Sequence, residues 1–292
     1  MNIRSRVQGR AGNLNQKGNR IAHGASASPF VETMTRLGYI VRGLVYGVIG
    51  VLAFQVAIGT GGGLNDTQGA IAALSRTPLG GILLYFILVG LVGYSLWGVI
   101  RAGLDTPSKS GGLKEIVERV GFAVSGISYA LLAYATYGLI TAKASAAQNG
   151  AQGAQAQQTT ASILSNSWGP WVIGLAGLII IGIGASQIVR GLHADFTKQF
   201  EVYALSTYRR IWMDRLGRFG TAARGVVFTL VGVFLFLAGY HHDPTLAKGI
   251  DGVLTALLHQ PAGPLLLGIV ALGLVAFGLY SALSGFWLRR KS

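Results

Sequence analysis

The sequence contains no cysteine and few charged residues, and these two absences exclude several classes of protein at once. Without thiols the chain has no thiol nucleophile, no cysteine ligand for an iron–sulfur cluster, no covalent haem attachment and no disulfide. Charged residues make up 12% of the 292 positions, about half of the share in ordinary soluble domains. The 44 glycines are roughly twice the usual share. Long apolar stretches rich in glycine are typical of helices packed in a membrane.

Six segments are long and apolar enough to cross a bilayer. A helix rises about 1.5 Å per residue, so roughly 20 apolar residues cross a hydrocarbon core of about 30 Å. The six segments are Leu37–Ile58, Leu79–Ile100, Val120–Thr141, Trp168–Val189, Phe219–Gly239 and Ala262–Leu288. Only Arg42 and Arg224 bring a charge into them. The sequence therefore predicts an all-α polytopic membrane protein with six transmembrane helices.

The distribution of the +14 net charge predicts the orientation of these helices. Of the 24 lysines and arginines, 21 lie on the side of the two termini and three lie in the loops on the other side. Because positive residues are retained in the cytoplasm, both termini are expected there. This explains the basicity without nucleic acid, and no nucleic-acid partner is expected. Residues 1–32 read as a disordered basic cytoplasmic tail, and residues 143–158 as a low-complexity outer loop.

A unit of two helices is repeated three times along the chain. The pattern Arg-x-Gly-x-x-x-Arg-Gly-x-x-Tyr begins at Arg36. It recurs from Arg119 with Ser125 in place of the second arginine, and from Arg218 with phenylalanine as its last residue. A constant offset also aligns the second helix of each unit. We predict repeats at residues 33–105, 113–195 and 214–288, with a cytoplasmic linker at 196–213. All three run in the same direction, which favours parallel repeats in a pseudo-threefold ring.

Two further features of the repeat concern its packing. A short amphipathic stretch precedes each second helix, and we expect these stretches to form interfacial helices; ordinary polar loops are the alternative. They are Thr67–Ser75, Thr159–Ser165 and Gly252–Leu258. Glycines beside the motif arginines allow a neighbouring backbone to approach closely. The expected packing glycines are Gly43, Gly47, Gly126 and Gly225.

Three stretches of the chain carry a resemblance to a known family: RLGYIVRGLVYGVIGVLAF, RFGTAARGVVFTLVGVFLF and DTQGAIAALSRTPLG. They resemble the bacterial membrane family known as domain of unknown function 1206. The resemblance covers about residues 33–288 and implies three two-helix repeats in the bacterial cytoplasmic (inner) membrane. The second repeat departs from the pattern, with Ser125 in place of arginine and no proline after the amphipathic stretch. The resemblance implies no activity.

The two arginines inside the apolar segments are the main candidate site. An ionisable group within a membrane is costly, so its presence favours a function. We predict a cytoplasm-facing site for an anion or a lipid headgroup, formed by Arg42, Arg224, Arg101 and Arg190. The alternative is that Arg42 and Arg224 extend to lipid phosphates at the inner surface or pair with a carboxylate: Asp105, Glu118, Asp195 or Asp214.

Groups that would indicate catalysis or a cofactor are missing. No HExxH, Gly-x-Ser-x-Gly or Walker pattern occurs, and no histidine lies where it could ligate haem inside the membrane. His241 and His242 are adjacent and lack the spacing of a metal site, even with Asp243, Asp251 and His259 nearby. We expect no enzyme activity, no cofactor and no metal.

The expected function is therefore non-enzymatic. No Asp or Glu lies inside an apolar segment, which argues against proton-driven transport. We expect an accessory or scaffold subunit that packs with a protein partner in a larger membrane complex and binds the headgroups of anionic lipids on its cytoplasmic face. A channel or carrier for a small solute or anion is the first alternative, and a membrane enzyme acting on lipid is the second.

Overall fold

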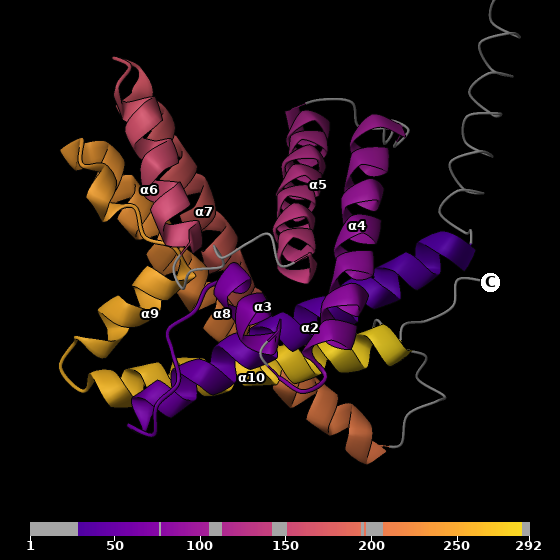
Figure 1. The fold of residues 1–292 in the computed structure, drawn as a ribbon. Coiled ribbons are helices and arrows are strands. Elements are labelled where there is room, and N and C mark those ends of the chain that lie inside the picture. The colour runs from indigo at the N-terminus through magenta and orange to yellow at the C-terminus, as the bar shows by residue number, and fades with distance from the viewer. Residues whose placement is uncertain are drawn as a thin grey trace, which may run out of the picture.

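In the computed structural model, residues 29–75, 77–104, 113–141, 151–193, 196 and 207–287 are described, and over these residues the chain is helical without a strand. The long helices (Figure 1) are α2 (Pro29–Ala57), α4 (Gly80–Leu104), α5 (Leu113–Ile140), α7 (Gly169–His193), α8 (Thr207–His241) and α10 (Gly263–Trp287). Each contains nearly all of one predicted apolar segment. The all-helical fold is confirmed.

Some helices extend beyond the apolar segments into residues predicted as a tail or a linker. Helix α2 begins at Pro29, inside the segment predicted as a tail, and residues 1–28 lie outside the described part of the chain. Helix α8 begins at Thr207, so residues 207–213 of the predicted linker are helical. A polar helical turn can continue an apolar one, because the backbone hydrogen bonds do not depend on side-chain hydropathy.

Short helices precede the second long helix of each repeat, as expected. They are α3 (Thr67–Ser75), α6 (Ala151–Leu164) and α9 (Ile250–Leu258), with a 3-10 turn, η1 (Pro244–Leu246), before α9. Helix α6 is longer than the amphipathic stretch, so residues 151–158 of the predicted outer loop are helical. Alanine and glutamine dominate this segment, and both are good helix formers. Residues 143–150 of that loop lie outside the described part.

The surface composition shows that the chain is a multi-pass membrane protein. Among the described residues, four segments are long and apolar enough to span a bilayer: Arg36–Ala57, Gly169–His193, Arg210–His241 and Gly263–Phe286. Gly80–Leu96 in α4 is a shorter apolar segment. Large apolar side chains point outwards on several helices, with Trp171 83% exposed and Ile82 72% exposed. Apolar surfaces of this extent are unfavourable in water and are suited to lipid.

The long helices pair across the repeats. The most extensive contacts join the second helix of one repeat to the first helix of the next: α4 with α5, α7 with α8, and α10 with α2. In Figure 1 the first long helix, α2, runs alongside the last, α10, so that the third repeat closes on the first. Within repeats, α8 contacts α10 and α2 contacts α4. The described residues of α5 and α7 form no interface of comparable extent.

The three pairs that cross repeats share one register, as glycines show. An added Cβ at Gly43 would lie 2.6 Å from both the carbonyl oxygen of Gly278 and the amide nitrogen of Ala282. The aligned glycines approach aligned backbone atoms of the preceding repeat: Gly126 lies against Ser95 and Val99, and Gly225 against Gly184 and Ile188. Three different pairs of helices therefore have the same geometry.

Gly47 plays a different part from the one expected. A Cβ added at Gly47 would meet nothing within 4 Å, so the small side chain is not needed there for close approach. At this contact the residue that must be glycine is Gly278 of the facing helix. A Cβ added to Gly278 would lie 2.7 Å from both the carbonyl oxygen of Gly43 and the amide nitrogen of Gly47.

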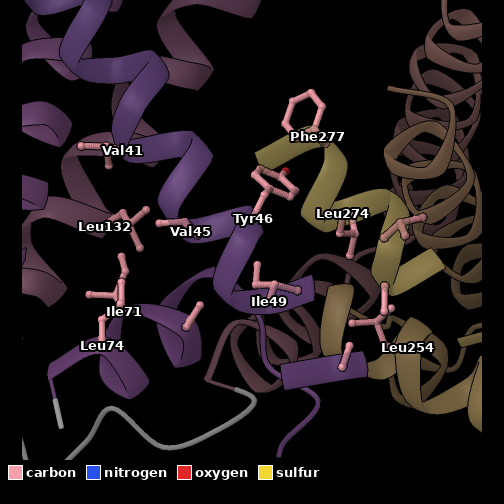
Figure 2. Close-up of a cluster of buried hydrophobic side chains, with 14 of the residues drawn as sticks. Val41, Val45, Tyr46, Ile49, Ile71, Leu74, Leu132, Leu254, Leu274 and Phe277 are labelled. Atoms are coloured by element: carbon pink, nitrogen blue, oxygen red, sulfur yellow. The ribbon is translucent and has the colours of Figure 1, made fainter. Parts of the chain in front are cut away.

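The largest buried apolar cluster of the described residues combines side chains from α2, α3, α4, α5, α8, α9 and α10 (Figure 2). Ile49 of α2 and Leu274 of α10 are fully buried in it. Figure 2 shows Tyr46 of α2 directed toward Phe277 of α10, at the edge of this cluster. Their ring centroids are 5.1 Å apart in an edge-to-face arrangement. The cluster holds α10 against α2 and thereby positions the arginines described next.

Candidate functional site

Arg42 and Arg224 meet around one aromatic ring, although 182 positions of sequence separate them. The guanidinium carbon of Arg42 lies 5.4 Å from the centroid of Phe277, and that of Arg224 lies 4.9 Å from it. Arg42 comes from α2, Arg224 from α8 and Phe277 from α10, so the close contacts of α10 with both helices create the arrangement. The two charges lie within about 10 Å of each other, roughly one Debye length at 0.1 M salt.

Neutral groups hold the guanidinium of Arg42. Its Nε donates a hydrogen bond of 3.4 Å to the Ser281 hydroxyl, which in turn donates one of 2.9 Å to the carbonyl oxygen of Tyr39. The Tyr39 ring also lies under the guanidinium, 5.1 Å from its carbon atom. Cation–π contacts of this kind stabilise a charge without neutralising it.

Arg224 has an equivalent environment. Its Nε donates a hydrogen bond of 3.1 Å to the Tyr46 hydroxyl, and its guanidinium carbon lies 5.2 Å from the centroid of the same ring. Phe228, one turn along α8, offers a second aromatic face at 4.7 Å. Each arginine is therefore bound by one neutral hydrogen bond and by ring faces, with several N–H donors left for other partners.

The second repeat completes the cluster with tyrosine and serine. Tyr129 of α5 is the repeat equivalent of Tyr46, and its ring lies 4.4 Å from that of Tyr94, the equivalent of Phe277. Tyr129 packs against the buried cluster that contains Tyr46 and Phe277. Ser125, one turn before it, stands where the other repeats have arginine and is half-buried. Two of the three motif positions thus carry a positive charge, and the third carries a hydroxyl.

Neither arginine pairs with a carboxylate within the part of the chain that is described. Asp214, considered above as a partner, accepts a hydrogen bond from the Phe196 amide and forms an ion pair of 2.7 Å with Arg218 on its own helix. Other carboxylates considered above lie outside the described side chains: Asp105, Glu118 and Asp195. Two charges inside an apolar bundle are costly when no described carboxylate pairs with them, so this arrangement is suited to an anion that binds both.

The structure brings together two of the four predicted arginines. Arg190 is exposed on α7, where its guanidinium bonds back to Ser186 through the carbonyl oxygen and the hydroxyl, both at 3.3 Å. It takes no part in the cluster around Phe277. The side chain of Arg101 lies outside the described residues.

Comparison with known proteins identifies the family. The model of the family "Domain of Unknown Function (DUF1206)" matches residues 37–105, 120–194 and 219–288. The chain belongs to this family. The "Uncharacterized protein YxxB" of Bacillus subtilis (strain 168) is 34% identical over 259 residues, which cover 89% of this chain and 92% of that protein. No solved structure matches the chain.

The DUF1206 repeats account for the composition of the site. Arg42, Ser125 and Arg224 each lie five residues after the start of their match, so the two arginines of the cluster occupy one position of the repeat, which is serine in the second repeat. Sequence reasoning alone did not select Phe277 or Tyr129 as parts of the site. The offset that aligns the second helices of the repeats makes Phe277 equivalent to Tyr94. An aromatic residue at the same position of two repeats could have indicated a role for that position beside the arginines.

Proposed function

We propose that this DUF1206 protein is a non-enzymatic membrane scaffold that binds the headgroup of an anionic lipid between Arg42 and Arg224. The observation that carries this proposal is the pair of guanidinium groups on Phe277, which lack a carboxylate partner among the described residues. Guanidinium groups match phosphate geometry through paired N–H donors. Two of them suit one phosphodiester.

The proposal includes six transmembrane helices with both termini in the cytoplasm. The six long helices and the distribution of lysine and arginine support it. The shared register of the three helix pairs supports a pseudo-threefold ring. In this orientation Arg42 and Arg224 lie about one and a half turns inside the cytoplasmic ends of the apolar segments. A lipid headgroup reaches this depth when the bilayer thins or the headgroup tilts inward.

A lipid fits this position better than a free anion because the faces of α5 and α7 offer apolar surface for its acyl chains. These helices form no extensive contact over their described residues, and their outer faces are apolar. Leu131 and Tyr134 on α5 and Leu175 and Leu178 on α7 are all exposed. Acyl chains can lie along such faces while the headgroup reaches the arginines. Similar apolar faces on α4 are available to a protein partner within the membrane.

The arginines are tested by removing both charges. Each hydrogen bond to a charged group is worth about 1.5–3 kcal/mol, so Arg42→Gln with Arg224→Gln should weaken the binding of phosphatidylglycerol at least about 100-fold. The matched control, Arg190→Gln with Arg215→Gln, removes two exposed arginines and should bind as the wild type does. The measurement is phosphatidylglycerol retained per chain after purification in mild detergent. Equal retention by all three proteins would refute the site.

The scaffold role is tested by purification from the native membrane in mild detergent. We expect a stoichiometric complex with another membrane protein. A protein that purifies alone under conditions that preserve its lipid would contradict this part of the proposal and leave the lipid site standing.

A carrier for small anions is the second candidate, because the arginines lie between helices of different repeats rather than at the outer rim. Reconstituted vesicles distinguish the two functions. We expect no chloride or phosphate flux above that of protein-free vesicles. Flux that disappears in the variant lacking Arg42 and Arg224 would establish the carrier instead.

A further inference from the structure

Helix α8 is longer than a bilayer requires, and the excess lies in its first turns. Its 35 residues extend over about 52 Å, whereas a hydrocarbon core is about 30 Å thick. The apolar segment Phe219–Gly239 is sufficient to fill the core, so residues 207–218, here called the α8 extension, lie on the cytoplasmic side in the proposed orientation. Helices α2 and α5 begin only eight and seven residues before their apolar segments. In Figure 1 the first turns of α8 project beyond α10.

One side of the α8 extension is anchored to the bundle. Met213 is 2% exposed and packs with Phe196 and Tyr280, whose ring centroids are 5.4 Å apart. A Cβ added at Gly217 would lie 2.8 Å from Cγ of Phe196, and Asp214 accepts a hydrogen bond from the Phe196 amide. The α8 extension is therefore held against α10 in a fixed orientation.

The opposite side of the α8 extension exposes aromatic and apolar side chains beside an arginine. Residues at the spacing i, i+3, i+4 and i+7 lie on one face of a helix. Four exposed residues have this spacing and are called the α8 face: Tyr208, Ile211, Trp212 and Arg215. The rings of Tyr208 and Trp212 meet edge to face, with their centroids 6.1 Å apart.

The height of the α8 face places it in water rather than in lipid. Trp212 and Tyr208 precede Phe219 by seven and eleven residues, which correspond to about 10 and 16 Å along the helix. The headgroup layer on one side of a bilayer is only about 5–8 Å thick. The usual helix tilt of about 20° shortens the two heights by only about 6%. Apolar surface that is exposed to water is unfavourable, and beyond the lipid it marks a site of protein interaction.

The charge around the α8 face determines which partner fits. The α8 extension contains four arginines and one aspartate, and this aspartate, Asp214, already pairs with Arg218. Residues 1–28 of the chain contain five basic residues and no acidic one, so the face repels them. A second copy that met the face symmetrically would bring the same arginines together. An acidic partner fits instead, and tryptophan, tyrosine and arginine are the residues that most often dominate protein interfaces.

We infer that the α8 face binds an acidic cytoplasmic segment of a membrane-protein partner. Trp212 and Tyr208 are the aromatic anchors, and Arg215 is the ionic contact. This inference rests on the scaffold role proposed above and supplies its binding surface and the charge of its partner. It does not involve the lipid site, because Arg42 and Arg224 lie within the apolar segments.

The test is site-specific photo-crosslinking in inside-out vesicles prepared from the native membrane. Tyr208 is replaced with p-benzoylphenylalanine, and the crosslinked peptides are identified by mass spectrometry. We expect one membrane protein, crosslinked through a segment of net negative charge. Adding Trp212→Ala and Arg215→Glu should lower the yield at least about tenfold, because tryptophan and arginine are typical hot spots. The matched control adds Trp171→Ala and Arg190→Glu, the same changes at exposed residues of α7, and should leave the yield unchanged.

A second measurement keeps the inference testable if that variant folds poorly. Raising sodium chloride from about 0.1 to about 1 M shortens the Debye length from about 10 to about 3 Å, so the yield should fall severalfold without any added substitution. The inference is overturned if Tyr208 crosslinks only to lipid or to a second copy of the chain, if the crosslinked segment is not acidic, or if neither salt nor the variant lowers the yield.

Failure of this inference is distinguishable from failure of the scaffold role. A partner that co-purifies with the wild type, while position 208 crosslinks to no protein, would contradict the α8 face and leave the scaffold role standing. A chain that purifies alone, with its lipid retained, would contradict the scaffold role and the α8 face together.

Discussion

Replacing Gly43 with alanine should loosen the contact that closes α10 on α2. The added Cβ would lie 2.6 Å from the carbonyl oxygen of Gly278 and from the amide nitrogen of Ala282, and 2.8 Å from the Cβ of Ala282. The first two are backbone atoms of a helix and cannot rotate away. Relief therefore requires the helices to separate by about 1 Å, toward the optimum of about 3.5–4.0 Å for carbon contacts.

The cost of this separation can be estimated. Forcing an extra methyl group into a packed interface costs about 1–3 kcal/mol, whereas exchanging glycine for alanine inside a helix gains up to about 1 kcal/mol. We expect Gly43→Ala to lower the free energy of unfolding by about 1–2 kcal/mol. Gly47→Ala is the matched control on the same helix, because its Cβ meets nothing within 4 Å. It should be neutral or stabilising by up to about 1 kcal/mol.

The equivalent glycines extend the test to the other two helix pairs. The nearest atom to an added Cβ is 2.8 Å away at Gly225 and 3.2 Å away at Gly126. Destabilisation by alanine should therefore decrease in the order Gly43, Gly225, Gly126, Gly47. The measurement is reversible unfolding in mixed micelles with increasing sodium dodecyl sulfate. A loss at Gly47 as large as that at Gly43 would refute the register in which α2 meets α10.

Two of three further predictions use the absence of natural cysteine, and the third concerns pH. Ala57→Cys with Gly268→Cys should form a disulfide on oxidation, because the two Cβ positions are 3.8 Å apart, the usual separation in a disulfide; a mobility shift on a non-reducing gel reports it. In intact cells a cysteine at Thr245 should react with an impermeant thiol reagent and one at Ser206 should not, and the reverse would exclude the proposed orientation. Wild-type stability should fall as the pH rises from the usual carboxyl pKa of 3.8 through the raised pKa of Asp251, because the folded state holds that proton more tightly. Melting temperatures of Asp251→Asn should lack this fall.

The sequence predicts the long helices well because the bilayer sets their length and excludes charge from them. Their number and their centres follow from hydropathy alone, as in α7 and α10. Helix α3 is predicted at the residues it occupies, because the amphipathic pattern begins directly after Asp66, whose carboxylate accepts the Gly69 amide as a helix cap. The extension of α6 was missed because low sequence complexity was interpreted as a loop, although alanine and glutamine favour a helix.

The candidate site was harder to predict, since the repeat does not specify which helices are neighbours. Hydropathy and spacing identify Arg42 and Arg224. They do not indicate whether α2 packs more closely on α4 or on α10. Their meeting on Phe277 depends on that choice. Arg190 is likewise an arginine next to an apolar segment. It lies on the exposed surface of α7, however, where it bonds to Ser186. Hydropathy predicts poorly which face of a membrane helix packs against protein and which faces lipid, because both neighbours are apolar.

The joint binding of one anionic headgroup by Arg42 and Arg224 is tested most directly by a cryo-EM map of the protein in nanodiscs that contain phosphatidylglycerol. We predict headgroup density in contact with both guanidinium groups beside Phe277, with acyl-chain density that continues along α5 and α7. A well-resolved map in which a carboxylate of the protein pairs with either arginine, or in which the space between them contains no lipid, would contradict the proposed function.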